Sequence, residues 1–541
     1  MQIDTKVLEQ TRMVSFGTNG DRGQIGKDFT ASLVARITQG LAEYLHQHAP
    51  GKIILIGYDT RRENQMRARE VACILAANKI KVNIIVDNFS PTPVLAYLAS
   101  SVESVGGVVN LTASHSPYMD GGFKFSPHHG GSADKSMTDA IQNLANKATR
   151  YQTTDYESAK HAQWIVELKS GSVVHFYVHR YILPTLKHLK SKNSSQSAWE
   201  DIVEYVRNHK DFCLVVDPMQ GTAVDTMKCL YGEIAKASGR LDFFKMIHVD
   251  NKDTEFKEVG GSPKPDDAKH YKGLVDAVKA SGPNAFGVSV DGDADRFGNV
   301  DFGGEFVSAN QMIGLLAFFL NREVGLAGSV GKTVASSNMI NAVADFLKLP
   351  LLETAVGFKW MVEHTIKRGV NFIVAGEESA HVGVGPFMRT WDDGIAVGLM
   401  GLWIVARTKK SLVEYERFIE HTIGKRFYNK RETIRGEDHS IKNSLNAMIK
   451  QTFKQLSENV ALQQVGIVKI MQEKLLKYPS LQREVIKEII TVDGVKVIFV
   501  SGDTVLWRPS GTEPAIKLYI EVTDKNRLED LYAVGKEIIL S

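Results

Sequence analysis

About the first 125 residues alternate short apolar runs with longer segments whose apolar residues recur every three or four positions. An apolar run at 53–58 is followed by a helical pattern at 63–78 and by a second apolar run at 81–86. Strands and helices that alternate in this way form α/β domains, in which helices cover a parallel or mixed sheet. The sequence therefore predicts an α/β fold for its N-terminal part.

The same alternation recurs twice more along the chain, and a segment richer in strands follows it. A length of 541 residues is enough for about three to five domains. The pattern predicts three related α/β domains with mixed sheets and a smaller C-terminal α+β domain, at 1–171, 172–305, 306–424 and 425–541.

Composition excludes several classes of partner. The net charge of +3 is small for this length and predicts neither a nucleic-acid nor a membrane partner. The N-terminus lacks the apolar core of a signal peptide, and the longest apolar run, at 394–406, is shorter than the roughly 20 residues that span a bilayer. Cys73, Cys213 and Cys229 lie in apolar contexts without metal-ligand spacing, so we expect buried reduced thiols in a cytoplasmic protein.

The stretch from Val108 to Lys124 places hydroxyl groups at the end of a predicted strand. The strand, 108–111, runs into the turn Thr-Ala-Ser-His-Ser-Pro, and a second, glycine-containing turn precedes Phe123. The ends of strands are where α/β proteins place their chemistry. Our hypothesis is that Ser114 carries a phosphoryl group covalently. The alternative is that these hydroxyl groups only cap a helix or stabilise a turn.

Three carboxylates follow the apolar strand 286–290 at every second position: Asp291, Asp293 and Asp295. Charges this close repel one another unless something neutralises them. A set of oxygen ligands suits a hard cation, Mg²⁺ first. An EF-hand loop would require glycine where Arg296 stands, so that motif is excluded. A solvated acidic turn is the alternative.

Two further loops carry polar groups that suit a phosphorylated sugar. The stretch 376–381 follows a predicted strand and includes Glu377, Ser379 and His381, which can bind hydroxyl groups or act as acid or base, although such groups also occur on plain surfaces. The stretch 508–512, Arg-Pro-Ser-Gly-Thr, offers a cation, two hydroxyl groups and a glycine for a phosphate, or forms a hairpin turn.

Two other stretches combine glycine with a basic residue, as phosphate sites do. Arg22 lies in a glycine-rich segment, 13–23, that predicts a loop, where its guanidinium could meet a phosphate or solvent. The segment Gly331-Lys332-Thr333 lacks the first glycine of a P-loop, because position 326 is leucine. A nucleotide site is therefore not predicted there.

Four motifs in one order along nearly the whole chain resemble the α-D-phosphohexomutase family, and most of all its bacterial phosphoglucomutases. They are Thr-Ala-Ser-His-Ser-Pro at 112–117, Asp-Gly-Asp-Ala-Asp-Arg at 291–296, Gly-Glu-Glu-Ser at 376–379 and Arg-Pro-Ser-Gly-Thr-Glu-Pro at 508–514. The resemblance implies four domains around a deep central cleft, each contributing one loop.

The resemblance also implies roles for individual residues. Ser114 matches the phosphoserine, whose oxygen completes a Mg²⁺ site formed by Asp291, Asp293 and Asp295. The sugar-binding matches are Glu377 and Ser379, and a loop that orients the sugar includes Gly357 and Lys359. The residues that match the distal phosphate site are Arg508, Ser510, Gly511 and Thr512. The positions that match residues around the phosphoserine and metal are Arg22, His115, Lys124 and Arg296.

The activity implied is the reversible interconversion of glucose 1-phosphate and glucose 6-phosphate, with glucose 1,6-bisphosphate as intermediate and activator. His381 and Lys359 are the candidates for the base, and His115 is expected to orient the serine phosphate. A histidine at position 381 is more typical of relatives that act on mannose or glucosamine phosphates, so a phosphomannomutase or a dual-specificity enzyme is the alternative. We expect hexose phosphates as the ligands, and a monomer or weak homodimer.

Two other classes compete with this interpretation. An aspartyl-phosphate phosphatase could use Asp291, but that chemistry leaves Ser114 and Arg508 without roles. A non-catalytic sugar-phosphate binder would not need both the serine and the acidic motif.

Overall fold

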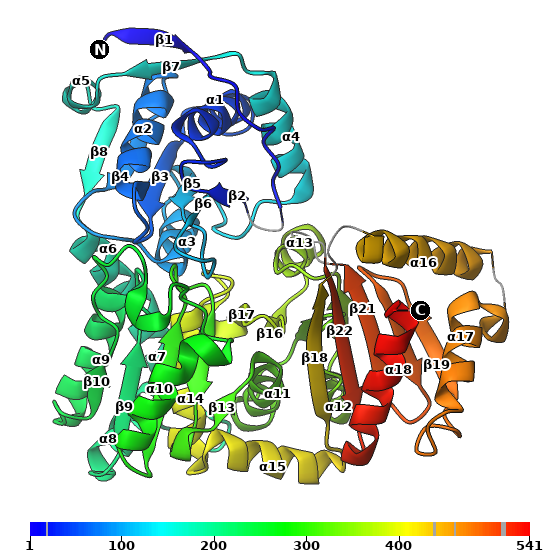
Figure 1. Cartoon of the computed structure of the whole chain (residues 1–541). Coiled ribbons are helices and arrows are strands. Elements are labelled where there is room, and N and C mark those ends of the chain that lie inside the picture. Colours follow the sequence, from blue (N-terminus) through cyan, green and yellow to red (C-terminus); the bar gives the residue numbers. More distant parts are fainter. Residues whose placement is uncertain (18–19, 436–439, 459–460, 510–514, 541) are drawn as a thin grey trace. The chain divides into compact units, whose positions relative to one another are not determined.

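The computed structural model describes residues 1–17, 20–435, 440–458, 461–509 and 515–540 (Figure 1). The chain divides into two compact units. Unit 1 comprises 1–329 and 357–416, and unit 2 comprises 330–356 and 417–541. The last boundary falls inside helix α15 (Leu412–Ile423). The predicted residues Ser510, Gly511 and Thr512 lie outside the described residues.

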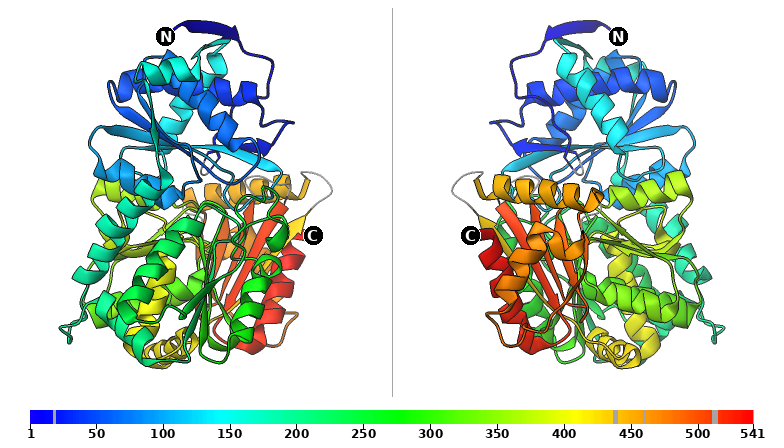
Figure 2. Two further views of the ribbon diagram at one scale, coloured as in Figure 1. Left: turned by 90° about the vertical axis from the view of Figure 1, so that its left-hand side faces the viewer. Right: turned by 90° about the vertical axis from the view of Figure 1, so that its right-hand side faces the viewer.

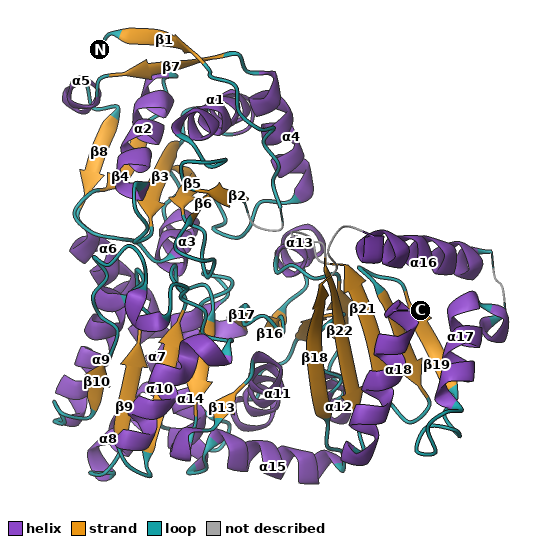
Figure 3. Ribbon diagram, viewed as in Figure 1, coloured by secondary structure: helices purple, strands orange, loops and turns teal. Residues whose placement is uncertain are grey.

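A six-stranded mixed sheet forms the N-terminal part of unit 1 (Figure 3). Its strands follow the order β2 (Asp21–Gln24), β6 (Asp120–Pro127), β5 (Val105–Leu111), β3 (Ile53–Tyr58), β4 (Val82–Ile85) and β8 (Ile165–Leu168). Strands β5, β3, β4 and β8 are parallel, whereas β6 and β2 run antiparallel to their neighbours. The flanking helices are α1 (Ala31–His48), α2 (Asn64–Ala77), α3 (Thr92–Ser101) and α4 (Lys135–Lys147). Apolar residues of α1, α2, α4 and the central strands form one core, as strands buried on both faces require.

Two local predictions in this region were wrong. Arg22 lies in the edge strand β2, not in a loop, and the glycines at 121 and 122 lie inside β6, not in a turn. A side chain at Gly122 would collide with the carbonyl oxygen of Thr112, so glycine is needed where β6 passes the serine loop. Glycine in a strand often marks such a close backbone approach.

The segment 127–170 contains strands as well as helices. Strand β7 (Arg150–Thr154) pairs antiparallel with β1 (Ile3–Val7), and Figure 2 shows this ribbon at the edge of the first domain. Helix α5 (Tyr156–His161) then leads to β8 at the edge of the main sheet. Strand β7 is mostly polar, and β8 has only four residues, one of them a glutamate, which weakens their signal in the sequence.

A second mixed sheet in unit 1 has five strands in the order β10 (Phe244–Met246), β9 (Cys213–Asp217), β11 (Ala285–Val290), β12 (Phe297–Val300) and β13 (Phe306–Val307). Helices that accompany it are α6 (Ser170–Tyr177), α7 (Leu183–His188), α8 (Ala198–Asn208), α9 (Val224–Ser238), α10 (Ala268–Ala280) and α14 (Gly394–Thr408). The apolar run 394–406 forms a buried helix, because all its residues are buried in α14.

The remaining elements of unit 1 carry the 376–381 loop. Strand β16 (Phe372–Gly376) pairs antiparallel with β17 (Val382–Val384), and the loop joins them. Helix α11 (Ala309–Phe319) packs against β16 and β17, and α13 (Lys359–Arg368) precedes β16 in the chain. Within the described ranges, none of the helices is both long and apolar enough to cross a membrane. The three cysteines are free; Cys73 is buried as predicted, but Cys213 and Cys229 are only half-buried.

Unit 2 contains a five-stranded antiparallel sheet, as the α+β prediction requires. Its order is β18 (Tyr428–Arg435), β22 (Ala515–Val522), β21 (Thr504–Pro509), β20 (Val495–Phe499) and β19 (Ile486–Ile490). Its helices are α16 (Ser440–Ser457), α17 (Gly466–Leu475) and α18 (Leu528–Leu540). Strand β15 (Leu351–Thr354), which pairs parallel with β14 (Ser329–Thr333), and helix α12 (Met339–Leu347) also lie in this part of the chain.

A buried cluster of opposite charges joins 330–356 to the C-terminal sheet within unit 2. Lys332 is fully buried, and its ammonium lies 3.0 Å from Glu353, which also pairs with Lys496 at 3.3 Å. Burial and the nearby Lys496 lower the pKa of Lys332 to about 8. Glu521 accepts hydrogen bonds from Ser337 and from the backbone N–H of Asn338. The lysine of the failed P-loop motif is therefore engaged in structural contacts.

Helix α1 crosses α4 so closely that Gly40 has no room for a side chain. A Cβ at Gly40 would lie 2.8 Å from the Cβ of Ala145, whereas a Cβ at the helical Gly232 would meet nothing within 4 Å. We expect Gly40→Ala to lower the apparent midpoint of thermal unfolding by about 2–8 °C, because overpacking outweighs the gain in helix propensity. Gly232→Ala is the matched control and should leave the midpoint unchanged or raise it by up to about 3 °C. Equal shifts in calorimetry would contradict the close crossing.

Candidate active site

The serine loop is held by two buried side chains that follow the neighbouring strand β3. Ser114 has a left-handed backbone conformation, with φ of 56°, and its N–H donates to Thr112 Oγ1 at 2.8 Å. The Thr112 hydroxyl donates to Asp59 at 2.6 Å. Arg61 forms an ion pair with Asp59 and donates to the carbonyl oxygens of Ser114 and Ser116 at 2.8 and 2.5 Å. The left-handed conformation costs roughly 1 kcal/mol or more and persists because these contacts impose it.

The acidic loop after β11 contacts this serine directly. The hydroxyl of Ser114 donates to Asp291 Oδ2 at 2.7 Å, and all three carboxylates of the loop are fully buried. A Cβ at Gly292 would lie 2.8 Å from the carbonyl oxygen of Ser114, so glycine allows the two loops to approach. The structure thus brings together Ser114, Asp291, Asp293 and Asp295 as predicted.

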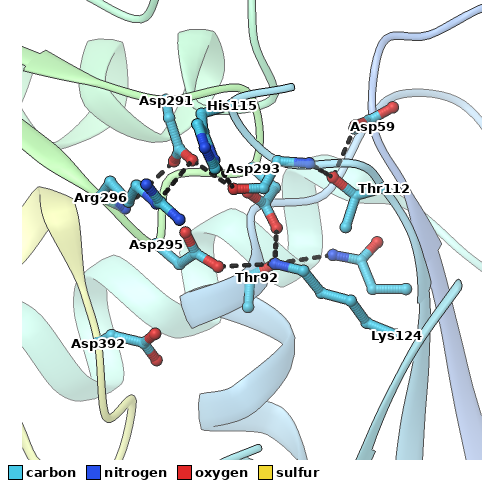
Figure 4. A network of polar contacts seen from close by, with 12 residues as sticks. Asp59, Thr92, Thr112, His115, Lys124, Asp291, Asp293, Asp295, Arg296 and Asp392 are labelled. Carbon is cyan, nitrogen blue, oxygen red and sulfur yellow. Dashed lines mark hydrogen bonds and ion pairs between the residues drawn. The ribbon is translucent and has the colours of Figure 1, made fainter. Parts of the chain in front are cut away.

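Lys124 bridges two of these carboxylates. Its ammonium lies 2.7 Å from both Asp293 and Asp295, and the Thr92 hydroxyl donates to Asp293 at 2.7 Å (Figure 4). Burial opposes the charge on Lys124, but Asp293 and Asp295 outweigh it and raise the pKa of this lysine. Lys124 is therefore a fixed cation at the base of the acidic cluster.

The cluster has the donors and the charge that a hard divalent cation requires. One oxygen each of Asp293 and Asp295 is buried without a hydrogen-bond partner among the described residues. Burial and the charges of Asp295 and Asp293 raise the pKa of Asp291 well above its ordinary value. The cations nearest the three carboxylates are Lys124, which pairs with Asp293 and Asp295, and Arg296, which lies 4.0 Å from Asp291. The three carboxylates and the Ser114 oxygen could therefore hold Mg²⁺, which prefers oxygen ligands.

His115 and Arg22 contact the serine loop. Nδ1 of His115 is 3.4 Å from Ser114 Oγ, and Arg22 donates to Ser116 Oγ at 3.3 Å. Burial, Arg296 and Arg22 lower the pKa of His115 well below its ordinary value, so the imidazole is neutral. The structure thus groups both predicted residues with the loop that carries Ser114.

The 376–381 loop contacts the acidic loop through Arg296. The guanidinium of Arg296 donates to the carbonyl oxygen of Ser379 at 3.1 Å. Glu377 is buried, which raises its pKa, and it accepts a hydrogen bond from the backbone N–H of Gly357. The Ser379 hydroxyl lies 3.5 Å from Glu377. Four predicted site residues are therefore grouped here.

His381 forms a pair with Asp392. The Nδ1 atom of the imidazole lies 2.7 Å from Asp392 Oδ2 and 3.7 Å from Asp295 Oδ1, and all three residues are buried. Asp392 follows the left-handed residue Trp391 and lies close to the acidic cluster in Figure 4. An imidazole oriented by a carboxylate in this way suits proton transfer.

Two further predicted residues lie in α13 and in unit 2. Lys359 begins α13, where its ammonium lies over the ring of Trp360 at 5.4 Å. Arg508 lies in β21 of unit 2, and its Nε donates to Asp493 at 2.6 Å.

Sequence reasoning missed four residues of the site: Asp59, Arg61, Thr92 and Asp392. Asp59 and Arg61 follow the predicted strand 53–58, so the strand-end argument that selected Ser114 could have selected them. Asp392 had no such signal, because its role depends on the distant His381.

Four family models match consecutive parts of the chain. They describe phosphoglucomutase/phosphomannomutase α/β/α domain I at 13–152, domain II at 174–304, domain III at 308–421 and the C-terminal domain at 449–534. The chain belongs to the α-D-phosphohexomutase family. The match to three α/β/α domains and a C-terminal domain also confirms the predicted fold class.

Individual relatives carry different names. A phosphoglucomutase of Komagataeibacter xylinus is 29% identical over 94% of this chain and 88% of its own. A phosphoglucosamine mutase of a Nitratiruptor species is 26% identical over 96% of this chain and 97% of its own. The crystal structure of parafusin, a phosphoglucomutase of Paramecium, in its open form has a TM-score of 0.77 at 21% identity and covers 99% of this chain and 96% of its own.

The acidic cluster predicts saturable binding of one divalent cation per chain. We expect Asp293→Asn to weaken Mg²⁺ or Mn²⁺ binding by at least about tenfold in isothermal titration, because it removes a ligand charge. The affinity should also fall as the pH decreases. This fall should begin at a higher pH than it would for ordinary carboxylates, because the raised pKa of Asp291 keeps this group protonated at pH values where ordinary carboxyl groups are ionised. Asp276→Asn, which alters an exposed carboxylate of α10, is the control. Similar affinities in both variants would contradict a metal site here.

Proposed function

We propose that this phosphohexomutase interconverts α-D-glucose 1-phosphate and glucose 6-phosphate through a phosphorylated Ser114 and a bound glucose 1,6-bisphosphate. The observation that carries the proposal is the 2.7 Å hydrogen bond between Ser114 and Asp291 in a cluster of three buried carboxylates. A serine oxygen fixed beside oxygen ligands is the arrangement that metal-assisted phosphoryl transfer needs.

The reaction is two phosphoryl transfers of opposite direction. In the first, the bond from phosphorus to Ser114 Oγ breaks, a bond to the free hydroxyl oxygen of the sugar forms, and that hydroxyl loses its proton to a base. In the second, after the bisphosphate has turned around, the bond from the other phosphorus to its sugar oxygen breaks, a bond to Ser114 Oγ forms, and the sugar oxygen takes back a proton from the base. Mg²⁺ bound by Asp291, Asp293 and Asp295 would supply charge neutralisation. Lys124 and Arg296 place two cations around the same atoms.

His381 is the base we favour, with Asp392 as its positioning residue. The 2.7 Å contact with Asp392 engages Nδ1 of His381, so the other ring nitrogen, Nε2, is the atom that would accept the proton. Neutral His115, 3.4 Å from Ser114 Oγ, suits orientation of the serine phosphate. Lys359 is the second candidate for the base.

Substrate binding would fall to the residues that match the sugar and phosphate loops of the family. Glu377 and Ser379 would bind sugar hydroxyl groups, with Gly357 ordering the Glu377 carboxylate. Arg22 would assist at the serine phosphate, and Arg508 with residues 510–512 would bind the non-reacting phosphate. Domain limits at 171, 305 and 424, a cytoplasmic location and a monomeric or weakly dimeric state complete the proposal.

Phosphomannomutase activity, alone or with phosphoglucomutase activity, is the second candidate. His381 favours it, because a histidine there is more typical of relatives that act on mannose or glucosamine phosphates. The phosphoglucosamine mutase among the relatives supports glucosamine phosphate as a further candidate substrate.

A panel of substrates tests the proposal. With Mg²⁺ and a trace of the bisphosphate, we expect glucose 1-phosphate to be turned over faster than mannose 1-phosphate and glucosamine 1-phosphate in a coupled assay. Ser114→Ala should lower kcat by at least about 10³-fold, because no other group can carry the phosphoryl group. Intact-protein mass spectrometry should find one phosphate that Ser114→Ala lacks.

Ser116→Ala is the control within the same loop. It should retain turnover within about tenfold, since among the described residues the Ser116 hydroxyl accepts a hydrogen bond from Arg22 alone. Faster turnover of mannose 1-phosphate would favour the second candidate. Full activity of Ser114→Ala would refute the covalent mechanism in both.

The His381–Asp392 pair predicts a coupled loss of rate. We expect His381→Ala to lower kcat by about 10²–10⁴-fold and Asp392→Asn by about 10–10²-fold with little change in KM. The double variant should be no slower than His381→Ala, because Asp392 acts through the imidazole. Steady-state kinetics of the four proteins measure this. Additive losses would show that the two residues act independently.

A further inference from the structure

Unit 1 contains a cavity of about 860 Å³ at the opposite end of its strands from the candidate active site. Val105 and Gly106 at the start of β5 line the cavity, whereas Ser114 follows the end of β5. Phe372 at the start of β16 lines it, whereas Glu377 follows the end of β16. A strand of the length of β5 spans roughly 20 Å, so this cavity is separate from the site of phosphoryl transfer.

The cavity has mostly apolar walls and a volume typical of small-molecule sites. Apolar side chains come from the end of α3 and the residue after it, from the end of α13 and the residues that lead into β16, and from the turn before α14: Ala99, Val102, Ile366, Val370, Phe372 and Met388. Trp391 and His129 add aromatic rings, which lie edge to face with centroids 5.7 Å apart. These walls suit a flat, apolar ring.

The charged groups of the cavity are mainly basic. Lys52 and Arg389 line it together with His48 and His128, and Glu103 is the one carboxylate among the lining residues. Lys52 donates to the backbone carbonyl of Glu103 at 2.8 Å. In the part of the chain that the structure describes, no carboxylate forms an ion pair with Lys52 or Arg389. The basic groups in these walls therefore favour a ligand with negative charge.

Trp391 connects the cavity to the proton-transfer pair. It lines the cavity, its backbone is left-handed with φ of 62°, and its indole N–H donates to the carbonyl oxygen of His129 at 2.7 Å. The next residue is Asp392, which holds His381 at 2.7 Å. A bulky residue with positive φ is strained and is held in that conformation by its surroundings, so a ligand that displaces Trp391 would release this strain.

We propose that this cavity binds a small organic anion with an aromatic ring, and that its binding inhibits the mutase by displacing Trp391 and, with it, Asp392. The inhibitory part rests on the proposed function, whereas binding does not. The sign follows from the structure: His381 Nδ1 and Asp392 lie at the short hydrogen-bond distance of 2.7 Å, so a shift of Trp391 that moves Asp392 can only weaken this contact. Nucleoside phosphates and aromatic carboxylates share this ligand chemistry.

Binding is tested on the full-length protein with paired probes. Equilibrium dialysis compares AMP with adenosine and 1-naphthoate with 1-naphthalenemethanol, so that each pair differs in charge, and inorganic phosphate serves as the anion without a ring. We expect AMP, 1-naphthoate or both to bind at least about tenfold more tightly than the neutral partner and than phosphate. The member that binds identifies which source of ligand the cavity takes.

Two variants place the binding in the cavity. Val102→Trp should fill the space, and the double variant Lys52→Met/Arg389→Met should remove the charge; each should weaken binding at least about tenfold while turnover without probe stays within twofold. Lys147→Met/Arg150→Met, which removes two exposed cations outside the lining, is the matched control and should bind like the parent protein. Because AMP could also enter a phosphate site, only binding that the cavity variants lose counts as support.

At saturating probe, kcat should fall at least about fivefold with KM for the hexose phosphate unchanged, and the residual turnover of Asp392→Asn should not respond. Absence of binding by both anionic probes, or binding that the cavity variants retain, would overturn the site. Binding without a change in kcat would overturn the inhibition. A protein without any mutase activity would refute the proposed function, and dialysis would still decide whether the cavity binds.

Discussion

Mutual repulsion among three buried carboxylates is the constraint on which the rest of unit 1 depends. Asp291, Asp293 and Asp295 are fully buried on one loop, and a buried charge is costly unless it is paired. Lys124, from the other sheet, supplies the cation at 2.7 Å from two of them. The acidic loop and the strand β6 are therefore held together by the same ion pairs that prepare the site. Removing Lys124 would leave the carboxylates uncompensated in a buried environment.

The serine loop depends on a second set of buried contacts that has no chemistry of its own. Asp59 and Arg61 reach the loop from the end of β3, and Arg61 also lies over the ring of Phe256 at 5.0 Å. Ser262 donates to the carbonyl oxygen of His115 at 2.6 Å. Elements of both sheets thus fix the backbone around Ser114 before any ligand binds. Such preorganisation is what phosphoryl transfer mainly requires of a protein.

The sequence predicted the parts of this site that follow from strand ends. Ser114, Asp291 and Glu377 each come directly after a buried strand, and apolar runs such as 286–290 and 372–375 are readable in the chain. Edge strands were not readable: β2 contains a glycine and charged residues, and β8 has only four residues, one of them a glutamate. Their pairing is decided by neighbours that are distant in the sequence.

Residues that act through a partner were the second group that sequence reasoning missed. Arg61 matters because it reaches two carbonyl oxygens on another loop, and Asp392 because it meets an imidazole eleven positions earlier in the sequence. The lysine of Gly331-Lys332-Thr333 was excluded from a nucleotide site on spacing alone, and the structure supplies its actual partners, Glu353 and the carbonyl oxygens of 336 and 337. Motif spacing therefore excludes chemistry more reliably than it finds supporting contacts.

The two histidines beside the acidic cluster differ in what surrounds them, and this difference argues for their separate roles. A proton accepted by His115 would face the guanidinium groups of Arg296 and Arg22, which already lower the pKa of that imidazole. A proton accepted by His381 would face two carboxylates instead, Asp392 at 2.7 Å and Asp295 at 3.7 Å. Since a base must hold the positive charge that it acquires, the electrostatic surroundings favour His381 over His115 for proton transfer and leave His115 to donate or accept a neutral hydrogen bond.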